Sequence, residues 1–192
     1  GLRFNNIEFL SNADGRPQTF FGGVANGFDF TNASPTGTSG VPFALTSQSD
    51  SFNQRLVTKG EFRGLQVERT FSFGVNDSFI AIDVFLKNTT TSSLSGVAWM
   101  EGFNPDPGLG LNESNQQTIN GVSGRMATAR YVNNQFGSGL TVGLAAPSAD
   151  GRATAKPIAS TQTPRDPFAL AQLGDVSGVQ STDAQLTLNF NI

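Results

Sequence analysis

The densest group of potential metal ligands lies in one short stretch of the sequence. Side-chain oxygens come from six residues within fifteen positions: Glu101, Asn104, Asp106, Asn112, Glu113 and Asn115. The chain contains no histidine and no cysteine, so a metal held here would be a hard cation bound by oxygen atoms. Calcium accepts irregular sets of carboxylate, amide and carbonyl oxygens, whereas magnesium usually binds together with substrate phosphates. We therefore predict a calcium site with the ligands Glu101, Asn104, Asp106 and Asn112.

The backbone around these ligands is predicted to leave the sheet. The seven residues from Gly102 to Gly108 include two prolines and two glycines, which do not continue a regular strand ladder. Loops held on a rigid sheet often carry binding groups. The spacing of the acidic residues does not match an EF-hand loop. The alternative is an ordinary turn in which asparagine and aspartate side chains cap their own backbone.

Two further residues are candidates for contact with a ligand, together with Asp106. Arg125 begins the strand that we predict over 124–132, the next strand after the oxygen-rich loop, so we expect it to face the same ligand. Trp99 is the only tryptophan, and its ring would offer an apolar platform with a hydrogen-bonding tip. The alternative for Trp99 is a place in the core, because it lies on a predicted central strand.

Arg69 has an unusual position for a charged residue. It falls in phase with Val67 and Phe71 on the apolar side of its strand. A buried arginine requires a carboxylate partner, because an unpaired buried charge is very costly. Glu68 and Asp83 are acidic residues of the same pair of strands. The alternative is a guanidinium that is presented to a ligand carboxylate.

The pattern of apolar residues indicates an all-β protein. Period-two alternation predicts strands over 65–73, 80–86, 140–144 and 186–192, and an aromatic strand over 97–101. A short Asn/Gly turn predicts that 124–132 and 140–144 form a hairpin. Residues 146–163 show no periodicity and are predicted to be a loop. A threonine cap, a proline and a following glycine predict one short helix from Thr163 to Gly174. We expect a β-sandwich of antiparallel strands with long loops and this one helix.

Composition limits the functions that the chain can have. Without histidine or cysteine there is no serine–histidine triad, no imidazole-bound zinc and no thiolate nucleophile, so we do not expect an enzyme. A carboxylate pair such as Glu101 and Asp106 can be named, but its spacing does not indicate glycoside hydrolysis. The net charge of −3 disfavours nucleic acid as a partner. No stretch approaches the ~20 apolar residues of a membrane span, so we expect no membrane insertion.

Three sequence features resemble a domain of the very long RTX-type adhesins of bacterial surfaces. They are the strand from Val67 to Ile80 (VERTFSFGVNDSFI), the strand end Lys87 to Thr89, and the aromatic strand that enters the loop from Trp99 to Gly108. The ending, with Asp166 to Ala171 and Asp183 to Ile192, is similar as well. Asn104 stands where the resemblance suggests the first aspartate of an Asp-Pro-Asp sequence, so the loop is one charge short.

The resemblance implies a secreted, calcium-dependent ligand-binding module on a bacterial cell surface. Such a module would grip the free C-terminal ends of peptides on other cells, in adhesion and biofilm formation. We expect residues 1–192 to form a single monomeric domain of a larger surface protein. Two alternatives remain: a lectin-like domain that binds glycans through calcium, and a structural spacer whose calcium only stiffens the fold.

Overall fold

The computed structural model describes residues 2–4, 7–10, 19–31, 54–74, 76–105, 118–131, 141–157, 178–180 and 184–192. Every regular element in these ranges is a β-strand, and the strands pair antiparallel. The prediction of an all-β, antiparallel protein is therefore confirmed. The helix predicted from Thr163 lies outside the described residues. No helix in the described ranges is long and apolar enough to cross a membrane.

The largest sheet has five strands and contains the predicted aromatic strand. Its order is β12 (Gly151–Pro157), β14 (Ala184–Asn191), β8 (Ala98–Phe103), β3 (Thr19–Ala25) and β4 (Phe28–Thr31). The central strand β8 is buried along its whole length. It pairs with β14 on one side and β3 on the other, so both of its edges are occupied.

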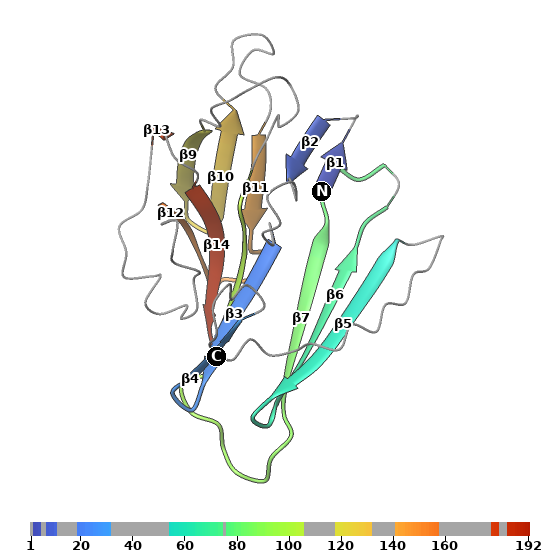
Figure 1. Cartoon of the computed structure of the whole chain (residues 1–192), viewed down its shortest axis with the longest axis vertical. Coiled ribbons are helices and arrows are strands. Elements are labelled where there is room, and N and C mark those ends of the chain that lie inside the picture. Colours follow the sequence, from blue (N-terminus) through green and yellow to red (C-terminus); the bar gives the residue numbers. More distant parts are fainter. Residues whose placement is uncertain are drawn as a thin grey trace.

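Two smaller sheets pack on one face of the five-stranded sheet (Figure 1). One has the order β5 (Arg55–Phe62), β6 (Leu65–Ser72) and β7 (Ala81–Asn88). The other has the order β11 (Thr141–Ala145), β10 (Met126–Tyr131), β9 (Thr118–Ser123) and β13 (Gly178–Gln180). A separate hairpin consists of β1 (Leu2–Phe4) and β2 (Ile7–Leu10).

The core between the layers has two parts. Under β5–β7 it is aromatic and includes Phe21, Phe30 and Trp99. Under β9–β11 it is built from small and aliphatic residues, among them Ala127, Ala129, Ala153, Leu186 and Leu188. Phe190 of β14 packs against both parts, so they meet at this side chain. Alternation along β8 and β14 places these residues on one face of the sheet, which is the pattern expected of a half-buried strand.

Two of the strands that the sequence pattern did not predict are β12 and β9. Residues 146–163 were predicted to be a loop, but β12 occupies part of that range and pairs with β14 over its whole length. The predicted hairpin of 124–132 with 140–144 is confirmed as β10 and β11, yet an unpredicted strand, β9, precedes it. In both missed strands the inward residues are small or polar, such as Ala153, Ala155, Thr118 and Asn120. Hydrophobic alternation is absent from such strands.

Two glycines make room for phenylalanine rings from neighbouring strands. Gly23 of β3 is directly opposite Phe30 of β4, and Gly102 of β8 is opposite Phe20 of β3. A Cβ atom at either position would collide with the ring that lies over the glycine. Each ring therefore covers backbone that a side chain would otherwise occupy, and both phenylalanines are buried.

Candidate functional site

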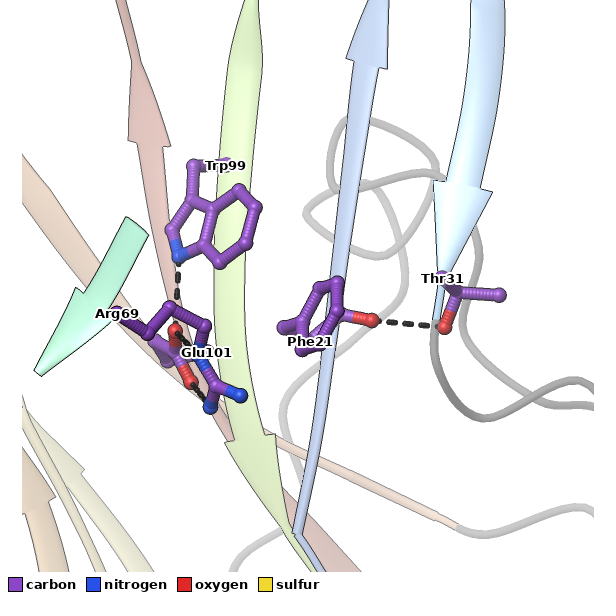
Figure 2. A network of polar contacts seen from close by, with 5 residues as sticks. All are labelled: Phe21, Thr31, Arg69, Trp99 and Glu101. Carbon is purple, nitrogen blue, oxygen red and sulfur yellow. Dashed lines mark hydrogen bonds and ion pairs between the residues drawn. The ribbon is translucent and has the colours of Figure 1, made fainter. Parts of the chain in front are cut away.

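Arg69 and Glu101 form a buried ion pair between the two layers. Arg69 Nε donates to Glu101 Oε1 at 2.8 Å, and Arg69 Nη2 donates to Glu101 Oε2 at 2.6 Å (Figure 2). Arg69 is 6% exposed and Glu101 5% exposed. Such a bidentate pair has fixed geometry and is stronger than a neutral hydrogen bond. The sequence prediction that Arg69 needs a buried carboxylate is thus confirmed, with Glu101 of the opposite layer as the partner.

Trp99 completes this polar cluster from the same strand as Glu101. Its indole Nε1 donates to Glu101 Oε1 at 3.0 Å, as Figure 2 shows. The ring is 1% exposed and stacks on Phe21 with a centroid distance of 5.1 Å. The structure therefore places Trp99 in the core, and its hydrogen-bonding tip is already used. Its position does not favour the predicted contact with a ligand.

The guanidinium of Arg69 also lies against two aromatic rings. Its central carbon is 4.6 Å from the centre of the Phe21 ring and 4.7 Å from the centre of the Phe71 ring. Cation–π contact of this kind stabilises a desolvated arginine. Phe21 is held in turn by its backbone oxygen, which accepts a hydrogen bond from Thr31 Oγ1 at 2.7 Å. The cluster thus connects β6 and β8 with the β3–β4 pair.

Burial determines the protonation behaviour of Glu101. Desolvation raises the pKa of the Glu101 carboxyl, and the charge of Arg69 and the hydrogen bonds from Arg69 and Trp99 oppose that rise without cancelling it. Both carboxylate oxygens are occupied, and a positive charge lies next to them. A calcium ion at Glu101 would lie next to the buried guanidinium of Arg69, so this position does not favour Glu101 as a calcium ligand. Its predicted role as a ligand stays a prediction.

Asn104, another predicted ligand, lies where the chain leaves the sheet. It follows the last residue of β8, where the chain leaves the sheet as predicted. Its Oδ1 atom is buried and accepts no hydrogen bond from a described residue. Buried polar atoms are nearly always paired, and an N–H donor, an ordered water or a cation can each pair with such an oxygen. Asp106 and Asn112, the other two predicted ligands, lie outside the described residues.

Arg125 lies just beyond the end of β9 that is farther from the loop. It occupies the turn between β9 and β10, and its Nη1 donates to the backbone oxygen of Pro147 at 2.8 Å. The loop re-enters the sheet at Thr118, at the opposite end of β9. A strand of this length spans about 20 Å. The prediction that Arg125 faces a ligand bound by the loop assumed that no strand lies between the loop and Arg125. The structure has the strand β9 between them.

Within the described ranges, no group of three or more acidic, histidine or cysteine side chains is arranged to hold a metal. The fold and the site together define an all-β protein of packed antiparallel sheets, with a buried ion pair between its layers. Comparison with family models, curated proteins and solved structures gives no match.

Proposed function

We propose that the chain is a calcium-dependent ligand-binding module of a bacterial cell-surface adhesin. Its ligand is the C-terminal end of a peptide on another cell, and binding serves adhesion and biofilm formation. The same proposal includes a single β-sandwich domain with long loops and one short helix. It also includes a noncatalytic role and secretion to the cell surface.

One observation carries the proposal more than any other: the buried Oδ1 of Asn104, at the start of the oxygen-rich loop, has no partner among the residues that the structure describes. Leaving a buried acceptor unpaired costs about 1–3 kcal/mol. A cation would remove that cost, and calcium readily takes amide oxygens as ligands. Asp106 and Asn112 would supply further oxygens from the same loop. When bound, calcium would supply positive charge that holds carboxylate oxygens of the protein and the ligand together.

The scaffold beneath the loop suits a binding role. All residues of β8 are buried, and both neighbours of β8 are paired with it in register. Pro105, the next residue after Asn104, is buried as well. The beginning of the loop is therefore fixed by a packed strand rather than by the loop itself. A rigid start of this kind reduces the ordering that ligand binding requires.

The proposal is tested by binding to immobilised peptides in the presence of calcium. We expect saturable binding to peptides with a free C-terminal carboxylate, and loss of that binding when the carboxylate is amidated or calcium is chelated. The variant Asp106→Ala should lose binding, whereas Asp29→Ala, which removes an exposed carboxylate on β4, should retain it.

The alternatives give different results in the same assay. Competition by a free monosaccharide with no effect of amidation would indicate a lectin. A melting temperature that rises with calcium, without saturable binding to peptide or glycan, would indicate a spacer. Absence of any calcium effect would contradict the proposal and both alternatives.

A further inference from the structure

The strand β7 has a free edge in the part of the chain that the structure describes. It pairs with β6 on one side, and no other described strand lies alongside it. Figure 1 shows β6 and β5 together on that one side. None of the eight residues of β7 is buried. A free strand edge presents backbone N–H and C=O groups that another strand can bind.

One backbone hydrogen bond shows which groups of β7 point to this edge. Thr89, the residue after β7, donates from its N–H to the oxygen of Gly64, the residue before β6. In an antiparallel pair the direction of these groups alternates from residue to residue. Odd-numbered residues of β7 therefore bond to β6. The N–H and C=O groups of the even-numbered residues, among them Val84 and Leu86, point to the free edge.

The outer face of β7 carries an acidic and a basic residue on either side of an aromatic one. Asp83 and Lys87 are exposed, and neither makes an ion pair or side-chain hydrogen bond with a described residue. Phe85 lies midway between them and is 58% exposed. Its neighbour on β6, Glu68, is already paired with Lys59 at 2.7 Å. The two charges of β7 are thus available to a partner strand.

The sequence of β7 is complementary to itself when two copies run antiparallel. Centred on Phe85, the two strands place Asp83 of each copy opposite Lys87 of the other. The same register places Val84 of each copy opposite Leu86 of the other, and the N–H and C=O groups of these residues point to the edge. The charged and aromatic residues then occupy the pairs without hydrogen bonds, in which side chains lie closer together.

The charges also select this register. Only registers that place even-numbered residues opposite each other join N–H and C=O groups across the edge. Centred on Asp83 or on Lys87, the pair would place two like charges directly opposite, which destabilises strand pairing. Centred on Val84 or on Leu86, it would pair neither charge with its opposite. By contrast β11, another edge strand, contains no charged residue, so its charges select no register.

We propose that two copies of the chain form a dimer through β7, with the two strands antiparallel and the two-fold axis at Phe85. The pairing joins the two three-stranded sheets into one continuous sheet. On its outer face, two ion pairs between Asp83 and Lys87 flank the contact of the two phenylalanine rings. On its inner face, the apolar even-numbered residues of the two copies pack together and extend the core part under β5–β7.

This dimer goes beyond the proposed function, because it uses neither calcium nor the loop after β8. Sedimentation of the full chain at increasing concentration, in the presence of a calcium chelator, therefore tests it separately. We expect the wild type to show a monomer–dimer equilibrium. The variant Asp29→Lys makes the same charge change on the exposed part of β4 and should dimerise like the wild type.

Variants of the two charges should weaken the dimer without disturbing the fold, since both side chains are exposed. Asp83→Lys and Lys87→Asp each place like charges opposite each other twice across the two-fold axis. Each single variant should raise the dissociation constant of the dimer about thirtyfold. The double variant Asp83→Lys/Lys87→Asp restores opposite charges in the same register and should dimerise like the wild type.

A mixture of the two single variants gives a sharper result. Asp83→Lys has lysine at both positions and Lys87→Asp has aspartate at both, so each variant repels itself and complements the other. The mixture should form heterodimers with a dissociation constant close to that of the wild type, which a variant that fails to fold cannot do. Hydrogen exchange at the amides of Val84 and Leu86 should slow as the protein concentration rises. It should change little at Phe85, whose N–H already bonds to β6.

Three results would overturn the proposal. The first is a wild type that stays monomeric at every concentration, as the resemblance to an adhesin domain leads us to expect. The second is a single variant that dimerises as tightly as the wild type. The third is slow exchange at Val84 and Leu86 that does not depend on concentration, because another segment of the same chain would then cover the edge. Loss of the calcium-dependent peptide binding described above would leave this proposal unaffected.

Discussion

Arg69 and Glu101 lie 32 positions apart in the sequence and form a bidentate ion pair between the layers, with 2.8 Å and 2.6 Å between the bonded atoms. The pair connects the middle strand of the three-stranded sheet to the middle strand of the five-stranded sheet. It is surrounded by Phe21, Phe71 and Trp99 and is almost fully buried. We interpret it as a structural connection that fixes how β6 sits over β8.

Removing one partner of this pair should strongly destabilise the fold. We expect Glu101→Ala to lower the free energy of unfolding by about 3–5 kcal/mol, because Arg69 would be left as an unpaired buried cation. The double variant Arg69→Met/Glu101→Leu should recover much of the loss, since apolar residues of similar volume tolerate the buried site. Denaturant unfolding of the three proteins measures both effects. Equal stability of the single variant and the wild type would show that the pair is not structural.

The raised pKa of Glu101 predicts a pH dependence of stability. Burial keeps the folded pKa above the unfolded value near 4.5, so the folded state holds the proton more tightly. As pH rises from the unfolded value through the folded pKa, this group should therefore lower the free energy of unfolding, which levels off above that range. Unfolding curves of the wild type, measured at several pH values between the unfolded and the folded pKa of Glu101, should show a free energy of unfolding that falls as pH rises. Glu101→Gln cannot titrate and should lack it; an identical slope in the variant would assign the effect to another group.

Gly23 should not tolerate a side chain. An added Cβ would collide with the Phe30 ring and approach the backbone oxygen of Ala98 to 2.9 Å, and the backbone cannot easily move in a paired strand. We expect Gly23→Ala to lower the free energy of unfolding by about 1–3 kcal/mol, as overpacked cores do. Gly121→Ala in β9 is a matched control, because its nearest contact is the hydroxyl of Thr128 at 3.3 Å. A smaller loss for Gly23→Ala than for the control would contradict this account.

The Asn104 amide should contribute to stability only when calcium is present. Without calcium, Asn104→Leu removes a buried oxygen that no described residue pairs with, and it should leave the melting temperature unchanged or raise it. With calcium, the wild type should gain stability by mass action and the variant should gain less. Thermal melting with calcium and with chelator compares the two. If Asn104→Leu loses as much stability in chelator as in calcium, the amide of Asn104 serves only the turn and does not bind calcium.

The strands with strong alternation could be predicted from the sequence, and the contacts between layers could not. Val67 and Phe71 indicated the inward face of β6 and therefore the burial of Arg69. Its partner could not be identified, because alternation shows which face a residue occupies but not which strand lies opposite. Glu101 shares a face with Trp99, and this was the available sign that Glu101 is buried rather than free to bind a metal.

The candidate site was predicted only in part for a related reason. The exit of the chain from the sheet at Asn104 followed from the prolines and glycines around it. The sequence places Arg125 next to the loop because it does not indicate β9. The inward residues of β9, Thr118 and Asn120, are polar, so this strand has no hydrophobic alternation. Because β9 runs away from the loop, Arg125 lies in the turn at the other end of the β9–β10 hairpin.

Calcium binding by the loop after β8 can be measured by isothermal titration calorimetry of calcium into the chelator-treated chain. We predict saturable binding in the wild type and in Asp29→Ala, and loss of that binding in Asp106→Ala. Calorimetric traces without binding heat in the wild type, together with an unchanged melting temperature, would contradict calcium binding by this loop. Asn104 and Asp106 would then be turn residues.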